Sequence, residues 1–154
     1  MIVRVEPITT YTEGARRVAL ALRREDVDEL WKISRSRPEE AVEQSIIGST
    51  EAYTAWIGDT PVAVMGASIS TLGRYGVPWL LGTRGIDDHA AEYIRMARKF
   101  LAHLHESCDV LENAALASNQ RTLVFLSRMG FDIGKPIKVR AGVEAVIFRS
   151  VKHV

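Results

Sequence analysis

The sequence predicts a mixed α/β (α+β) domain with a largely antiparallel sheet, flanking helices and one βαβ crossover. First, 154 residues is the length of one domain with one core. Second, 47% apolar and 25% charged residues are typical of a globular protein. Third, strand-like and helix-like segments follow one another without linker, repeat or low-complexity segment. We therefore expect residues 1–154 to form a single domain.

The first third of the chain predicts one strand and two helices. Residues 2–8 alternate in polarity and reach Pro7, as a short strand does. A helix follows from about Thr12, and its expected buried face has helical spacing: Ala15, Val18, Ala19 and Leu22. Residues 24–34 predict a second helix that is acidic in its first turn. Its expected buried side consists of Val27, Leu30, Trp31 and Ser34.

Residues 36–48 predict a third helix with signals at both ends. Ser36 and Glu39 have the spacing of a capping box, and Pro38 lies near the expected start. Gly48 is placed to end the helix.

The middle of the chain predicts strands and then the clearest helix. Two β-rich runs within residues 51–70 surround Gly58 and Asp59, which is a hairpin signal. Residues 76–83 predict another strand, which must begin at, bulge at or have an edge beside Pro78. Residues 89–107 predict a long helix with this apolar stripe: Ala90, Ile94, Ala97, Leu101, Leu104 and Cys108.

The last third predicts the closing strands around one more helix. Residues 109–117 form an expected strand, and the preceding strand and long helix make the βαβ crossover. A helix then runs from Asn119, a good N-cap, to Gly130, which suits a left-handed ending. Residues 131–139 and 144–151 supply two final strands.

The charge and the cysteine content limit the classes of function that the sequence suggests. Twenty basic and nineteen acidic residues give a net charge of +1, which offers no overall drive towards nucleic acid or anionic membrane. The one cysteine, Cys108, fits a reducing compartment and is expected to be a small buried apolar residue. No run approaches the ~20 apolar residues of a membrane span.

Common catalytic patterns do not occur in the chain. There is no nucleophile elbow, P-loop or dinucleotide glycine fingerprint, and no histidine or cysteine grouping has zinc-site spacing. His103 is expected on a solvated helix face, His105 beside the apolar stripe and His153 in a frayed tail. Arg95, Arg98 and Lys99 are interpreted as a solvated face as well.

The helix spanning residues 119–131 carries a resemblance that extends over most of the chain. Its Asn119, Thr122, Leu126 and Gly130-Phe131, with the order of elements, resemble the GCN5-related N-acetyltransferase (GNAT) superfamily. The segment "PWLLGT" (residues 78–83), the long helix and "LENAALASNQRTLVFLSRMGF" (residues 111–131) resemble small GNAT-like proteins of tailed bacteriophages, of the internal virion protein A type. The resemblance implies a single GNAT-like domain.

The resemblance also implies where acetyl-CoA would lie. In the superfamily the backbone of the fourth strand pairs with the pantetheine arm, and a Q/R-x-x-G-x-G/A loop wraps the pyrophosphate. The implied cofactor-binding residues are Leu80, Leu81, Gly82, Arg84 and Asn119. Asp87 and His89 stand where the loop needs small residues, and Asp87 adds a negative charge. Asp87 or Asp88 is expected to cap the next helix instead, with Arg84 as partner of the carboxylate.

The catalytic groups of the superfamily are not matched. Many GNAT enzymes carry a proton-donating tyrosine seven residues after the helix-starting asparagine, and that position is Leu126 here. Ser127 points about 100° around the helix, so it is a poor substitute. Glu51 and Glu112 are the carboxylates available as a base, and both are interpreted as solvent-facing. No catalytic residue is assigned.

Three hypotheses follow. The first is a phage or prophage protein of the GNAT fold, a virion or assembly component with impaired or absent acyl transfer, in the host cytoplasm or virion. Its partners would be other phage structural proteins. The second is an acetyl-CoA-dependent N-acetyltransferase acting on an amine. The third is a module that binds acetyl-CoA without turnover. Fold alone does not choose among them.

Overall fold

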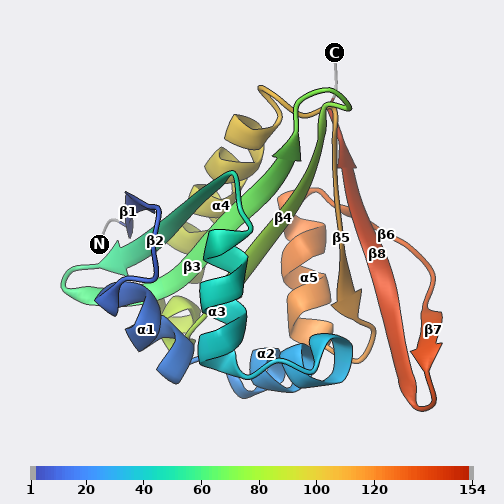
Figure 1. Cartoon of the computed structure of the whole chain (residues 1–154), viewed down its shortest axis with the longest axis horizontal. Helices are drawn as coiled ribbons and strands as arrows, with labels where there is room; N and C mark the ends of the chain where they lie inside the picture. The colour runs from blue at the N-terminus through green and yellow to red at the C-terminus, as the bar shows by residue number, and fades with distance from the viewer. Residues whose placement is uncertain (1–2, 153–154) are drawn as a thin grey trace.

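A computed structural model describes residues 3–152 of the chain. Its centre is an eight-stranded sheet in the order β1-β2-β3-β4-β5-β8-β6, with β7 paired to β8 (Figure 1). The strands are β1 (Val3–Ile8), β2 (Glu51–Ile57), β3 (Thr60–Ser70), β4 (Tyr75–Gly82), β5 (Val110–Leu116), β6 (Asp132–Ile133), β7 (Ile137–Arg140) and β8 (Val143–Val151). β4 and β5 are parallel, whereas the other pairings are antiparallel, so the mixed and largely antiparallel sheet is confirmed.

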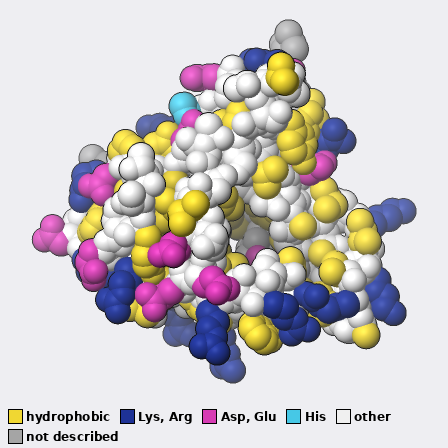
Figure 2. All heavy atoms as spheres, in the orientation of Figure 1, with side chains coloured by type: hydrophobic (Ala, Val, Ile, Leu, Met, Phe, Trp, Pro, Cys, Tyr) yellow, Lys and Arg dark blue, Asp and Glu magenta, His cyan; other side chains and the backbone are white. Residues whose placement is uncertain are grey.

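Helices cover both faces of the sheet. They are α1 (Glu13–Leu20), α2 (Arg24–Glu29), the π-helix η1 (Leu30–Ser34), α3 (Pro38–Ile47), the 3₁₀ helix η2 (Arg84–His89), α4 (Ala90–Leu104) and α5 (Gln120–Met129). α1 and α3 lie in front of the sheet in Figure 1, and α4 lies behind it. Figure 2 shows the same face with its side chains, where acidic groups gather over the region of α1 and α3. Each face buries its own apolar cluster, one with α1 and α3 and the other with α4 and α5. Within residues 3–152, no helix is both long and apolar enough to cross a membrane.

The parallel pairing between β4 and β5 ends early. Only Tyr75 with Val110 and Gly76 with Leu111 are paired, and the strands then diverge (Figure 1). Pro78 lies just beyond this point and pairs with Ala67 of β3 on its other side. The expected edge beside Pro78 is confirmed, because the missing N–H faces the side from which β5 has departed. We call the diverging region the β4–β5 splay.

Several local predictions are confirmed. Thr12 Oγ1 accepts from the backbone N–H of Ala15 at 3.1 Å at the start of α1. Gly58 joins β2 and β3 with a φ of 58°. At the end of α5, Gly130 has a φ of 100°, and Phe131 N–H donates to the carbonyl of Leu126 at 3.1 Å. Local hydrogen bonding and backbone sterics therefore govern these ends, as their sequence signals imply.

The expected capping box of the third helix is wrong. Arg37 is the N-cap residue of α3 and makes no side-chain cap hydrogen bond, and Pro38 is the first helical residue. Ser36 Oγ instead donates to the carbonyl of Ser34 at 3.3 Å. Ser36 bonds to η1 rather than to α3 because η1 ends just before it, with Arg35 in the left-handed region at a φ of 54°.

The segment expected to form the second helix consists of two shorter helices, and its buried side differs from the expected one. Residues 24–29 are α-helical, but residues 30–34 form a π-helix whose carbonyls at Lys32 and Ile33 accept from the Arg140 guanidinium. The expected apolar side is right only in part. Val27 and Leu30 are half-buried, and Leu30 packs against the cluster of α1 and α3, whereas Trp31 and Ser34 are exposed and Asp26 is buried. The reason is that this helix covers polar backbone at the splay rather than an apolar sheet face.

Two further elements differ in detail. Ala90 is exposed, and the buried face of α4 is centred on Tyr93, Met96, Ala97, Phe100, Leu101 and Leu104. The strand expected over residues 131–139 is interrupted, because Pro136 cannot donate a ladder hydrogen bond and separates β6 from β7.

Cys108 is fully buried, as expected. His153 lies outside the described residues.

Candidate functional site

The β4 edge of the splay offers backbone groups in alternation. Thr83 N–H donates to Val62 of β3, whereas the carbonyls of Pro78 and Gly82 receive partners from the splay side. Backbone groups of alternate residues point to opposite neighbours. Leu80 and Gly82 therefore face the splay, and Leu81 faces β3. Of the three β4 residues that the resemblance implies for the pantetheine arm, Leu80 and Gly82 thus turn their backbone groups to the open side of the strand.

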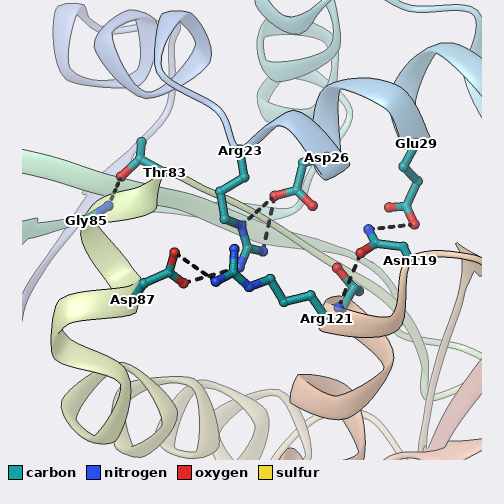
Figure 3. Close-up of polar contacts among 9 residues, drawn as sticks. Arg23, Asp26, Glu29, Thr83, Gly85, Asp87, Asn119 and Arg121 are labelled. Atoms are coloured by element: carbon teal, nitrogen blue, oxygen red, sulfur yellow. Dashed lines mark hydrogen bonds and ion pairs between the residues drawn. The ribbon is translucent and has the colours of Figure 1, made fainter.

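Helix α2 bridges the wide end of the splay. At its start, Arg23 N–H donates to the carbonyl of Gly82 on β4 at 3.2 Å. At its end, Glu29 Oε1 accepts from the N–H of Leu116 on β5 at 2.7 Å, and Asn119 Nδ2 lies 3.5 Å away. Figure 3 shows the side chains of Arg23, Asp26 and Glu29 directed from α2 towards the start of α5 and η2. The carbonyl of Gly82 and the N–H of Leu116, at the two diverging strand ends, thus have hydrogen-bond partners from α2 and the residue before it.

The narrow end of the splay is also bridged. Asn113 of β5 donates from Nδ2 to the carbonyl of Pro78 at 2.8 Å, and its Oδ1 accepts from the N–H of Ala114 at 2.7 Å. The backbone groups left facing the splay between these bridges are those of Leu80 and the N–H of Gly82.

A buried ion pair lies beneath α2. Asp26 Oδ2 accepts from Nε and Nη2 of Arg23, both at 3.2 Å, and both residues are under 10% exposed. Burial raises the pKa of Asp26, and the guanidinium of Arg23 opposes that rise. Burial likewise raises the pKa of Glu29, while the hydrogen bond from Leu116 lowers it. Charges held in this way are expensive to separate.

The polar groups of the loop at the implied pyrophosphate position have partners within the chain. Thr83 Oγ1 accepts from the N–H of Gly85 at 3.2 Å and opens η2. Asp87 Oδ2 lies 3.3 Å from Nη2 of Arg121, and its Oδ1 lies 4.0 Å from Nη1 of Arg23 (Figure 3). A carboxylate therefore sits between two guanidinium groups and faces the Arg121 fork and Nη1 of Arg23, the nitrogens that Asp26 leaves to another anion.

Two expectations for this loop are wrong. The described partners of Asp87 are Arg23 and Arg121 rather than Arg84, which is exposed. Neither Asp87 nor Asp88 caps α4, because His89 is the N-cap residue and no side-chain cap hydrogen bond forms there. The ion pairs draw Asp87 away from the helix axis towards α2 and α5. The first N–H groups of α4 consequently lack a side-chain acceptor.

A groove lies beside this loop, between α4 and α5. It has a volume of about 520 Å³, and its lining includes Arg23, Asp87, Tyr93, Arg121 and Arg128. The hydroxyl of Tyr93 is buried without a hydrogen-bond partner among the described residues, and burial raises its pKa. We call this the α4–α5 groove. Its arginines suit an anion, whereas Asp87 repels one.

The positions at which the resemblance implies a catalytic acid and a base hold no free catalytic group among the described residues. Leu126 is 8% exposed and belongs to the core packed by α4 and α5, so no proton donor occupies that position. The expectation that Glu51 and Glu112 merely face solvent is wrong. Glu51 Oε1 accepts from Tyr53 at 3.0 Å and lies 2.6 Å from His103 Nε2. Glu112 accepts from Tyr75 at 3.1 Å and pairs with Arg149 at 3.6 Å.

The structure brings some predicted residues together and adds others. Leu80, Gly82 and Asn119 lie around the splay, whereas Arg84 lies in a different pocket with Arg17 and Arg24. Sequence reasoning missed Arg23, Asp26 and Glu29, although their i, i+3, i+6 spacing marks one polar helix face. It also missed Arg121, two residues after Asn119.

Comparison with known proteins supports the architecture. No family model matches the sequence, and no curated protein matches it. RimL, the ribosomal L7/L12 α-N-protein acetyltransferase in complex with coenzyme A, is similar with a TM-score of 0.72 and 9% identity, over 98% of this chain and 94% of that one. AAC(6')-Ib in complex with ribostamycin and coenzyme A has a TM-score of 0.70 and 13% identity, over 99% and 94%.

A GNAT-family protein from Desulfovibrio desulfuricans is similar as well, with a TM-score of 0.67 and 15% identity over 97% of this chain and 98% of that one. At these identities the likeness concerns the fold, and the chemistry must be argued from the residues. This chain has the fold of the GNAT acetyltransferases.

Proposed function

We propose that this chain uses the GNAT fold for interaction rather than acyl transfer. The observation that carries the proposal is the pairing of Asp87 with Arg23 and Arg121, in the loop where the resemblance implies the pyrophosphate. Helix α2 adds to it by bridging β4 and β5 at the wide end of the splay. With Leu126 in the core, the position of the usual acid supplies no proton.

The resemblance to small GNAT-like proteins of tailed phages supplies the biological setting of the proposal. The chain would act as a virion or assembly component, bind other phage structural proteins, and occur in the host cytoplasm or the virion. An interaction protein needs the fold and its surface, but it does not need an open cofactor cleft.

An acetyl-CoA-dependent N-acetyltransferase is the second candidate. Coenzyme A or acetyl-CoA is bound in several of the similar structures. In this chain, Arg23 and Arg121 converge on one anion, the carboxylate of Asp87. A pyrophosphate that displaced Asp87 would gain both guanidinium groups. Leu80 and Gly82 would then bind the pantetheine arm through their backbone.

Thermal melting with and without acetyl-CoA separates the two candidates. A ligand at 100 times its Kd stabilises a protein by about 2.7 kcal/mol, which corresponds to roughly 5–10 °C at this size. We expect no shift at millimolar acetyl-CoA. A shift together with acetylation of a polyamine, aminoglycoside or peptide amine would refute the interaction proposal and establish the enzyme. A shift without product would indicate a module that binds the cofactor without turnover.

The Asp87→Gly variant tests the reason for the closed site. We expect this variant to gain a measurable acetyl-CoA shift, because it frees Arg121 and Nη1 of Arg23 and removes a negative charge, while Asp26 keeps the other Arg23 nitrogens. Asp88→Gly is the matched control, since Asp88 is exposed and makes no ion pair among the described residues. Equal behaviour of the two variants would show that Asp87 does not control the site.

A further inference from the structure

A second groove lies on the α4 side of the sheet, between β1 and α4. Its volume is about 680 Å³, and its lining comes from β1, β2, β3 and α4. It shares no lining residue with the α4–α5 groove. We call it the β1–α4 groove. None of the positions implied for acetyl-CoA contributes to it, so its occupant is a separate question.

The floor of the β1–α4 groove is apolar. Val5 of β1 is 39% exposed although it lies on the same sheet face as the core of α4. Met96 and Phe100 line the groove from successive turns of α4, and Phe100 packs edge-on against Tyr53 with ring centroids 5.7 Å apart. An open apolar floor of this size is typical of a site for a small molecule.

The rim of the groove carries cations without a counter-ion. Arg95 and Lys99 lie one turn apart on α4, and neither has an ion pair or side-chain hydrogen bond within residues 3–152. Glu92 also lines the rim, one turn before Arg95, so these three side chains sum to a single positive charge.

The other charged groups that face the groove are already engaged. His103 Nε2 lies 2.6 Å from Glu51, and its Nδ1 lies 3.8 Å from Glu106. The hydroxyl of Tyr53 donates to the same Glu51 oxygen. Glu51 does not line the groove, and its carboxylate makes no ion pair with Arg95 or Lys99 within residues 3–152. The free charge on the rim is therefore cationic, directly above an apolar floor.

We propose that the β1–α4 groove binds an amphipathic monocarboxylate, such as a straight-chain fatty acid. Its carboxylate would lie between Arg95 and Lys99, and its alkyl chain would cover Val5, Met96 and Phe100. The net positive charge of the rim matches a single anionic head. The binding energy comes mainly from the chain, because exposed ion pairs contribute little and burial of CH₂ groups contributes more.

Three probes with the same tail test the proposal by calorimetric titration below their micellar concentrations. We expect decanoate to bind and decylammonium to bind at least about fivefold more weakly, the effect of about one exposed ion pair. Decanol should lie between them. Equal binding of all three, or no binding of decanoate, would overturn the proposal.

Charge-reversal variants locate the head group. We expect Lys99→Glu to weaken decanoate about fivefold or more and to strengthen decylammonium. Lys135→Glu is the matched control, because Lys135 is exposed, lies between β6 and β7, and changes the net charge equally. Asp87→Gly should leave decanoate binding unchanged. A similar loss in Lys135→Glu, or a change in Asp87→Gly, would place the fatty acid elsewhere and refute the assignment.

Discussion

The two grooves beside α4 differ in how two of their cations are paired. In the α4–α5 groove, Arg23 and Arg121 are held by the chain's own carboxylates, Asp26 and Asp87. In the β1–α4 groove, Arg95 and Lys99 have no such partner among the described residues. The fold positions both grooves, but side chains decide which one is available to a ligand. The pairing of Arg23 and Arg121 with the chain's own carboxylates is the physical basis of our proposal that the chain uses this fold for interaction.

The largest expected effect comes from breaking the buried charge pair. Arg23→Ala should lower the free energy of unfolding by about 3–5 kcal/mol, because Asp26 would remain buried without a counter-ion. Denaturant unfolding measures this loss. Arg74→Ala is the control for an exposed pair, with Asp109, and should cost less than about 1 kcal/mol. Similar costs for both would mean that the α2 pair is not effectively buried.

Introducing the superfamily's tyrosine at position 126 should lower stability rather than produce activity. Leu126→Tyr places a larger polar side chain in a packed core and should destabilise the protein by about 1–3 kcal/mol, without producing acetyl transfer. Leu126→Met, which nearly conserves volume, should cost under about 1.5 kcal/mol. Thermal melting and a transfer assay check both. An active Leu126→Tyr variant would show that this position does reach a bound cofactor.

Stability should depend on pH through Glu29. Because its pKa is raised in the folded state, native protein holds a proton that the unfolded chain has released at the same pH. Stability should therefore fall as pH rises from the ordinary glutamate value to the raised one, with a slope of at most about 1.4 kcal/mol per pH unit for one proton.

The Glu29→Gln variant should show a smaller pH slope, measured by denaturant unfolding at several pH values. The exposed Glu40→Gln variant should keep the wild-type slope. An unchanged slope in Glu29→Gln would assign the pH dependence to Asp26 or to another group.

The smallest effect is expected at the open groove. Lys99→Glu should change the free energy of unfolding by less than about 0.5 kcal/mol in the absence of ligand, because Lys99 makes no described contact that the change would break. Thermal melting measures this. A loss comparable with that of Arg23→Ala would mean that the rim charges serve the fold, and the contrast between the two grooves would disappear.

Features with a local cause were predictable from the sequence. The Gly58 hairpin, the Asn119 cap and the Gly130 ending depend on residues within one turn of each other, so spacing alone suffices. The partners of Arg23 and Glu29 were not predictable, because they come from β4, η2 and β5, remote in the chain. The β1–α4 groove was missed for a related reason. Helical spacing assigned Arg95 and Lys99 to solvent, but it cannot show that the strand opposite leaves Val5 uncovered.

The hydrogen bond from Leu116 to Glu29 has a consequence for the order of folding. It joins residues 87 positions apart, so during synthesis α2 must wait for β5 to emerge. A helix of six residues is too short to persist in water by itself. We therefore expect α2 to acquire structure late, after the β1–β2–β3 meander. Its amides should gain protection from hydrogen exchange together with those of β5 rather than with its chain neighbour α1.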